Sequence, residues 1–194
     1  MINIKNVKVY GLDESIIRSG LAMRTELPNI NNMEESDVKR GLKLGNAKTG
    51  SGHDNFLKGV VVQFDLLYPE YLSPEMQRYH WFEIITSMSK MHRLSVMNIR
   101  ECCNEWVDDR VIDIVENLRQ QYNDNKTFEN FMRLLSNCPL GLEKWMAITT
   151  NYLQLKTIYY QRRKHKLMEW RVICDWIENL PHFQVLCLGK LDEN

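Results

Sequence analysis

The feature that most constrains the fold is a run rich in β-branched residues, Gly59-Val60-Val61-Val62-Gln63-Phe64-Asp65-Leu66. β-Branched side chains favour an extended backbone, so this run predicts a strand, and Pro69 marks its end. Loose alternation of apolar and polar residues predicts another strand over 2–9. Residues 183–188 are a further strand candidate. The sheet is therefore expected to be small.

Most of the remaining chain has helical patterns. A capping Ser73 followed by Pro74 predicts the start of a helix, and Asp108 or Asp109 and Thr127 are start signals of the same kind. With apolar residues spaced three or four apart, these signals predict helices at 15–26, 33–44, 73–94, 108–122, 127–135, 142–163 and 168–179. We see no internal repeat and no linker. The sequence therefore predicts a single domain over residues 1–194, with an α+β fold in which helices pack on the small sheet.

The charge balance excludes broad classes of function. Lys plus Arg is 25 and Asp plus Glu is 25, so the formal net charge is zero. This excludes a globally basic nucleic-acid binder and argues against a nucleic-acid partner. The charges are segregated, however, because residues 156–171 carry six basic residues and one acidic residue, whereas residues 101–130 are mainly acidic. The basic segment predicts a local site for an anionic ligand.

The remaining composition indicates a compartment. The five cysteines are odd in number and form no Cys-x-x-Cys pair, so we expect reduced thiols in a cytoplasmic protein and no metal site. No signal peptide or membrane span is expected. The sequence contains neither the common dinucleotide and P-loop motifs nor the zinc-protease and hydrolase motifs. No catalytic residue can be assigned from spacing alone.

One set of polar residues falls on the helix predicted over 73–94. Thr86, Ser89, His92 and Arg93 would lie near one another on one face, beside a stripe with His80, Ser87 and Lys90. Hydroxyl, imidazole and guanidinium groups can hold a phosphate or a nucleotide. The alternative is a solvated face of an amphipathic helix.

A second set falls on the helix predicted over 142–163. Asn151 and Arg162 are eleven residues apart, so on a helix they would point the same way, about 16 Å apart. Such a line could span a nucleotide; the alternative is a basic helix end that complements the helix dipole. The cluster from Arg162 to Lys166 could instead contact nucleic-acid phosphates. His53, after Gly50-Ser51-Gly52, could reach a ligand from a loop or be a plain loop histidine.

In order and spacing, these segments resemble the flavin-dependent thymidylate synthases over most of the chain. The closest local matches are Asn151-Tyr152-Leu153-Gln154-Leu155-Lys156, then Arg162 or Arg163, then Met168-Glu169-Trp170-Arg171. In that family an Asn eleven residues before an Arg lies on this helix, and a Gln-Trp-Glu-type segment begins the next. The resemblance implies the fold of that family, flavin or folate contacts near Asn151, and phosphate contacts at Arg162 or Arg163.

The signature of that family is mostly changed in this chain. The signature runs Arg-His-Arg, two residues, Ser, one residue, Asn-Glu, one residue, Ser, one residue, Arg-Tyr. With its last Arg at Arg93, Trp81-Phe82-Glu83 occupies the Arg-His-Arg position and Thr86 replaces the first Ser. The sequence is therefore interpreted as a diverged relative.

The resemblance implies a protein that acts on or binds a pyrimidine deoxynucleotide, as a flavin-dependent methyl- or hydroxymethyltransferase if it is an enzyme. FAD and folate are the implied cofactors, and the implied assembly is a homo-oligomer, a tetramer in the family. The alternative is a non-enzymatic nucleotide-binding protein on the same scaffold that has lost flavin chemistry. The predicted nucleotide-binding residues are Arg78, Ser87, Ser89, Arg93, Arg162 and Arg163. The predicted cofactor-binding residues are His53, His80, His92 and Asn151.

Overall fold

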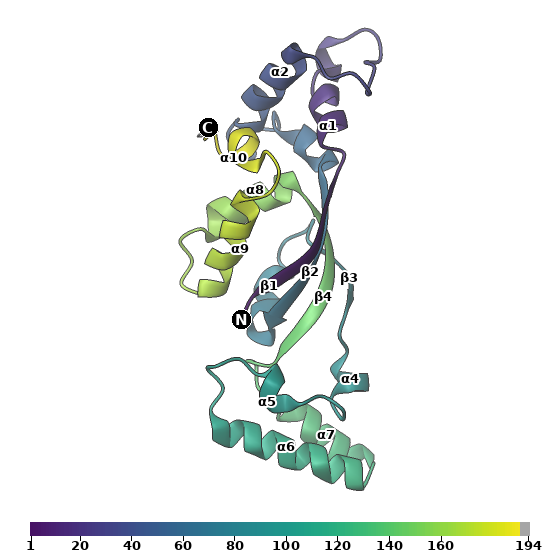
Figure 1. Cartoon of the computed structure of the whole chain (residues 1–194), viewed down its shortest axis with the longest axis vertical. Helices are drawn as coiled ribbons and strands as arrows, with labels where there is room; N and C mark the ends of the chain where they lie inside the picture. Colours follow the sequence, from purple (N-terminus) through teal and green to yellow (C-terminus); the bar gives the residue numbers. More distant parts are fainter. Residues whose placement is uncertain (191–194) are drawn as a thin grey trace. The chain divides into compact units, whose positions relative to one another are not determined.

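The computed structural model describes residues 1–190, and its strands form one four-stranded sheet in the order β1-β2-β4-β3 (Figure 1). The strands are β1 (Asn3–Tyr10), β2 (Val61–Pro69), β3 (Glu83–Ser87) and β4 (Glu143–Asn151). Backbone bonds from Glu70 to Leu142 and from Tyr152 to Val60 show that β2 and β4 are antiparallel. β1 and β2 confirm the strands predicted from residues 2–9 and 59–66, and the α+β fold class is confirmed.

Contacts divide the chain into two compact units. The first consists of Met1–Lys5, Asp65–Arg78 and Ile84–Ile148, and the second of Asn6–Phe64, Tyr79–Glu83 and Thr149–Asn194. All four strands contribute residues to both units. The expectation that residues 1–194 behave as a single domain stays a prediction.

The first unit packs its helices around a small apolar core. Its helices are η3 (Glu70–Leu72), α3 (Ser73–Met76), α4 (Lys90–Arg93), α5 (Ile99–Cys102), α6 (Asp109–Asp124) and α7 (Phe128–Ser136). The side chains of Asp108 and Thr127 accept hydrogen bonds from the backbone N–H groups of Arg110 and Asn130, so both predicted helix caps are confirmed. The core of this unit is formed by Leu94, Ile99, Ile112, Val115, Leu118, Leu134 and Leu142.

The second unit contains the remaining helices. These are α1 (Leu12–Arg18), η1 (Leu21–Met23), α2 (Glu35–Gly45), η2 (Asn55–Gly59), α8 (Tyr152–Arg162), α9 (Met168–Glu178) and α10 (Phe183–Cys187). Figure 1 shows α8 and α9 side by side. The Tyr152 ring packs edge-on against Phe183 at 5.1 Å, and its hydroxyl donates to the Pro181 carbonyl. This buried aromatic packing fixes α8 against α10.

The prediction of one continuous helix over 73–94 is wrong. Only α3 and α4 are helical there, and Glu83–Ser87 forms the strand β3 between them. Ile84, Ile85 and Thr86 are β-branched, and the Met88 N–H donates to the Trp145 carbonyl at 2.9 Å, just past the end of the strand. Although the apolar residues of this segment are spaced as in a helix, hydrogen bonding to β4 makes it a strand.

Two other predicted elements are also corrected. The helix predicted over 142–163 is a strand in its first half, because Glu143–Asn151 pairs as β4 and α8 begins only at Tyr152. The strand predicted over 183–188 is the helix α10, whose Phe183, Leu186 and Cys187 are buried. The other predicted helices are confirmed with shifted ends, and the one over 15–26 is divided into α1 and η1.

Candidate functional site

Several of the polar residues singled out in the sequence gather around helix α8 in the second unit, and this helix begins at a capping residue. The Asn151 Oδ1 atom accepts a hydrogen bond from the Gln154 N–H at 2.9 Å, and both side chains are buried. Asn151 has an extended backbone and precedes the helix. The prediction that Asn151 and Arg162 share one helical face is therefore wrong; the two residues mark the two ends of α8.

The segment around Trp81 lies against the beginning of α8. The Trp81 N–H donates to the Gln154 Oε1 atom at 3.3 Å, and the Thr150 hydroxyl donates to the Trp81 carbonyl at 2.7 Å. These bonds fix the Trp81 backbone on both sides. The indole ring itself is 49% exposed, with the His80 ring edge-on at 4.8 Å between centroids.

The C-terminal end of α8 holds Arg162 among aromatic rings. Its Nε atom donates to the Tyr79 hydroxyl at 2.7 Å, and that hydroxyl donates to the Gln161 Oε1 atom at 3.1 Å. The guanidinium carbon lies 5.6 Å from the centroid of the Tyr79 ring and 4.9 Å from that of Trp170. Cation–π contacts and the hydroxyl bond together fix the plane of the guanidinium. An oriented guanidinium is suited to a phosphate.

The middle of α8 carries a buried ion pair that positions the His53 loop. The Lys156 Nζ atom donates to Asp54 Oδ2 at 2.7 Å and to the carbonyls of Gly45 and Ala47 at 2.8 and 2.7 Å. The ammonium thus has three acceptors, which meets the requirement for burying a charge. Because Asp54 directly follows His53, the pair holds the His53 loop close to α8.

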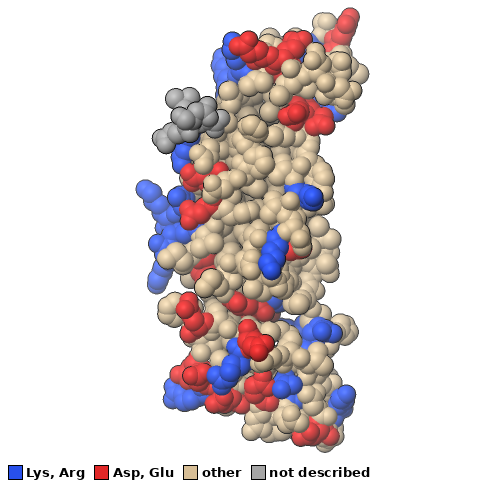
Figure 2. Space-filling view, viewed as in Figure 1, with Lys and Arg blue, Asp and Glu red and all other residues tan. Residues whose placement is uncertain are grey.

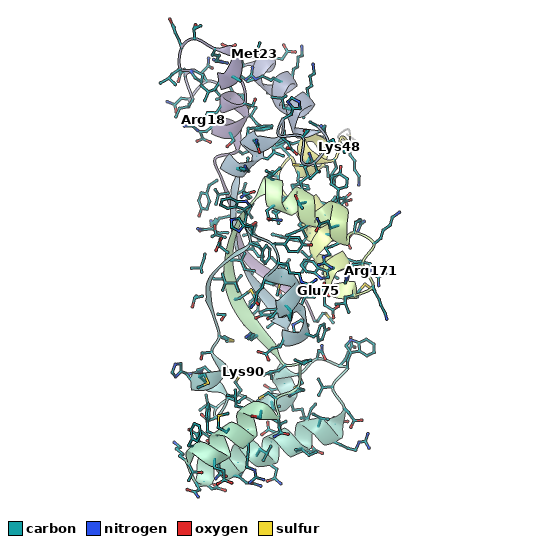
Figure 3. The ribbon with its side chains drawn as sticks, turned by 180° about the vertical axis from the view of Figure 1, so that it is seen from behind. Arg18, Met23, Lys48, Glu75, Lys90 and Arg171 are labelled. Carbon is teal, nitrogen blue, oxygen red and sulfur yellow. The ribbon has the colours of Figure 1, made fainter. Side chains whose placement is uncertain are left out.

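A cavity of about 760 Å³ opens beside His53 in the second unit. Arg18 and Met23, which are labelled in Figure 3, are among its lining residues. Lys43 and His53 add basic groups, Ser15 adds a hydroxyl, and Phe56 adds an aromatic ring. Arg40 also lines the cavity, but its guanidinium is paired with the buried Asp37 and bonded to Ser19. No acidic residue lines the cavity within residues 1–190. Such a lining fits a ligand that combines phosphates with a flat apolar ring.

Arg163, the second arginine of the predicted pair, is engaged elsewhere. Its guanidinium forms ion pairs with Asp175 and Glu178. The hydrogen bond from Lys190 outweighs partial burial and, with the Tyr159 hydroxyl, holds the pKa of Glu178 below its usual value. A phosphate at Arg163 would have to compete with two ionised carboxylates. Both Arg162 and Arg163 are therefore held by other side chains of the second unit, and their predicted role as phosphate contacts stays a prediction.

The other predicted residues lie in the first unit. Arg78 lies on a turn, Ser87 on β3, Ser89 just before α4, and His92 and Arg93 on α4. The single helical face expected for Thr86, Ser89, His92 and Arg93 does not form, because Thr86 lies on β3. Ser87 lines a hollow of about 360 Å³ together with Asp65. The negative charge of the Asp65 carboxylate would repel a phosphate in this hollow. His53, His80, Asn151, Arg162 and Arg163 lie in the second unit.

Lys90 was predicted on the stripe with His80 and Ser87. In the structure it has a structural role. It forms an ion pair with Glu70, as does Lys144, and Lys90 is labelled in Figure 3. Burial alone would raise the pKa of Glu70, but the hydrogen bonds from the two lysines prevail and lower it. This cluster ties α4 and β4 to η3 inside the first unit.

Several contacts at the candidate site were not predicted from the sequence. They involve Asp54, Lys156, Trp170 and the basic cavity residues Arg18, Arg40 and Lys43. A lysine inside a helical pattern is usually interpreted as a solvent-facing residue, so the burial of Lys156 was missed. The phase of the helix offers a signal, because Lys156 lies four residues after Tyr152 and three before Tyr159, both buried.

Lysine and arginine gather where the chain turns from α8 to α9, as Figure 2 shows. This agrees with the charge segregation in the sequence, where residues 156–171 are basic. Part of that charge is neutralised by Asp175 and Glu178.

The five cysteines are the remaining candidate reactive groups of the described chain. All five cysteines are free thiols, and burial raises the pKa of Cys103, Cys138 and Cys174 to about 11. Such thiols stay protonated at neutral pH and are poor nucleophiles. Within residues 1–190, no group of three or more His, Cys, Asp or Glu side chains is placed to hold a metal ion. No helix in the same range is long and apolar enough to cross a membrane.

The fold is that of the flavin-dependent thymidylate synthases. The structure is similar to that of the flavin-dependent thymidylate synthase of Helicobacter pylori complexed with FAD and dUMP, with a TM-score of 0.71 and 17% identity, covering 98% of this chain and 100% of that chain. A second structure of that enzyme gives a TM-score of 0.70 and 15% identity over 95% and 97% of the two chains.

A related enzyme has the same fold. The UMP/dUMP methylase of Streptomyces cacaoi bound with 5-Br dUMP gives a TM-score of 0.65 and 12% identity, covering 96% of this chain and 91% of that chain. No family model matches the sequence, and a search of curated proteins finds no match. The structural likeness confirms the fold implied by the sequence resemblance.

Proposed function

We propose that this chain is a flavin-dependent thymidylate synthase-like protein that binds a pyrimidine deoxynucleotide together with FAD. The observation that carries the proposal is the arrangement of α8, with the buried amide of Asn151 at its start and the ring-held guanidinium of Arg162 at its end. The structural neighbours are complexes with FAD and dUMP or with a bromo-dUMP, which supports this choice of ligands.

Arg162 is assigned to the nucleotide phosphate. Its plane is fixed before a ligand arrives, so little conformational freedom is lost on binding. Asn151 is assigned to the cofactor side of the site, because it lies at the opposite end of α8.

The cavity beside His53 is assigned to FAD. Arg18 and Lys43 supply positive charge for its phosphates, and Phe56 supplies an apolar wall. A bound reduced flavin supplies hydride, and a folate supplies the one-carbon unit in the transfer that the family resemblance implies. The contribution of this chain is to bind and orient, through the residues of α8 and the His53 loop.

The nucleotide assignment is tested by comparing two neighbouring arginines. Binding of dUMP and of deoxyuridine is measured by calorimetry for the wild type, Arg162→Ala and Arg163→Ala. Loss of a charge-assisted phosphate contact should weaken dUMP binding about tenfold or more in Arg162→Ala. Deoxyuridine, which has no phosphate, should bind equally to all three. Equal losses in both variants, or none in either, would contradict the assignment of Arg162.

The cofactor assignment is tested with added FAD. The purified protein should show flavin absorbance at about 450 nm after reconstitution and gel filtration. Arg18→Ala/Lys43→Ala should retain less FAD than the wild type, and Arg133→Ala, on α7, serves as a control. A chain that binds dUMP but retains no FAD would instead fit the alternative of a nucleotide-binding protein without flavin chemistry.

We also propose that the chain forms a homo-oligomer, as the family resemblance implies. The exposed strand β3 supports this, since all five of its residues are exposed. The cytoplasmic location expected from the cysteine pattern stays a prediction.

A further inference from the structure

Trp81 is a large apolar side chain that the second unit holds at its surface. Its indole is 49% exposed, whereas the nearby side chains of Tyr79 and Phe82 are buried. Phe82 packs edge-on against Phe64, with 6.0 Å between ring centroids. Tyr79 is joined to Arg162 and Gln161 on α8. Buried anchors on both sides of Trp81 therefore keep its ring at the surface.

The backbone of Trp81 is fixed as well. Its N–H is bonded to Gln154 and its carbonyl accepts from Thr150, so both main-chain polar groups are satisfied in this one conformation. A shift of this backbone segment would break these bonds and leave buried groups without partners, which is costly, so the point from which the indole projects is fixed. An exposed indole on a fixed backbone is a rigid surface, and its apolar face gains free energy when a ligand covers it.

The surroundings of the ring indicate what kind of ligand fits. The His80 ring lies edge-on against the indole, 4.8 Å between centroids, and supplies ring nitrogens beside it. The Arg162 guanidinium, proposed for the phosphate, is bonded to Tyr79, two residues before Trp81. Flat heteroaromatic rings stack on tryptophan with their faces and hydrogen-bond through their edges. An imidazole beside an indole suits such a ring better than it suits an aliphatic surface.

We propose that Trp81 is a stacking surface for the planar heteroaromatic ring of a bound ligand, either the isoalloxazine of the flavin or the base of the pyrimidine nucleotide. This rests on the proposed function. Trp81 stands where the family signature has its first Arg, so this chain presents a ring face there in place of a guanidinium. Recognition at this position then depends on the face of the ligand ring and is insensitive to salt.

The test compares ring-retaining and ring-removing variants of the full chain. Affinities for FAD and for dUMP are measured separately by calorimetry for the wild type, Trp81→Phe and Trp81→Leu. Trp106→Leu is the matched control, since Trp106 is 78% exposed and belongs to the first unit. Trp81→Leu should weaken one of the two ligands about tenfold or more, whereas Trp81→Phe should stay within about threefold of the wild type. The weakened ligand identifies the stacked ring.

Three results would overturn the proposal. Trp81→Leu could bind both ligands as tightly as Trp106→Leu does, or Trp81→Phe could be as weak as Trp81→Leu. The third result is a Trp81→Leu protein whose mass in solution changes while both affinities stay constant, which would assign the indole to a subunit contact. A wild type that binds neither FAD nor dUMP refutes the proposed function itself and this inference with it. Circular dichroism of each variant verifies folding.

Discussion

At the scale of single residues, Tyr79 determines how Arg162 is presented. Its hydroxyl accepts from the Arg162 Nε atom and donates to Gln161, and its ring covers one side of the guanidinium. Tyr79→Phe keeps the ring and removes only the hydroxyl. We expect dUMP binding to weaken about fivefold, because the guanidinium loses the bond that fixes its rotation. Calorimetry with dUMP and with deoxyuridine measures this effect.

The matched control for this residue lies on the same helix. Tyr160→Phe removes a hydroxyl from a ring that is 58% exposed on α8. It should leave dUMP binding unchanged. A purely structural role of Tyr79 would weaken deoxyuridine and dUMP binding alike, and that result would contradict its role in positioning Arg162.

At the scale of elements, α8 depends on the buried pair of Lys156 and Asp54, whose side chains are 1% and 2% exposed. Lys156→Met leaves Asp54 buried without its partner and removes the donor to the carbonyls of Gly45 and Ala47. We expect the free energy of unfolding to fall by about 3–5 kcal/mol. Lys164→Met, just beyond α8 at an exposed position, should change it by less than about 0.5 kcal/mol. Urea denaturation measures both.

A double variant separates the charge from the packing. Lys156→Met/Asp54→Leu removes both charges and should recover part of the loss, since no buried carboxylate is left unpaired. Equal stabilities of Lys156→Met and Lys164→Met would show that the pair does not hold the His53 loop to α8.

The elements that could be predicted from the sequence are those with a local signal. Asp108 and Thr127 cap helices with their own side chains, so α6 and α7 are visible in the sequence. β3 and β4 are not, because a strand between helices is stabilised by its partner, and pairing such as Met88 with Trp145 depends on residues far apart in the chain.

The same distinction applies to the site. Spacing and family resemblance single out Asn151 and Arg162, and their roles stay predictions; the structure corrects only their placement, at the two ends of α8. What orients them could not be predicted: Tyr79 is 83 residues from Arg162, and Asp54 is 102 residues from Lys156. Contacts between residues so far apart in the chain follow from the pairing of β2, β3 and β4. A helix over 142–163 contains no β4, so this prediction could not include that pairing.

At the scale of the whole molecule, the two edges of the sheet differ. In the order β1-β2-β4-β3 the edge strands are β1 and β3. β1 carries Lys5 and Lys8, charges of the kind that discourage pairing with another chain. β3 carries Ile84 and Ile85, which are 44% and 55% exposed on opposite faces of the strand. The β3 edge is therefore the part of the sheet that we expect to contact another copy of the chain.

Mass in solution tests this expectation. Light scattering after gel filtration should give the wild type a multiple of the 23.1 kDa chain mass. Ile84→Lys/Ile85→Lys places two charges on the edge, and the cost of burying them should shift the population to smaller species. Ile114→Lys, at a side chain 57% exposed on α6, should keep the wild-type mass. A wild type of 23.1 kDa at micromolar concentration, or equal dissociation of both variants, would show that β3 does not form the contact.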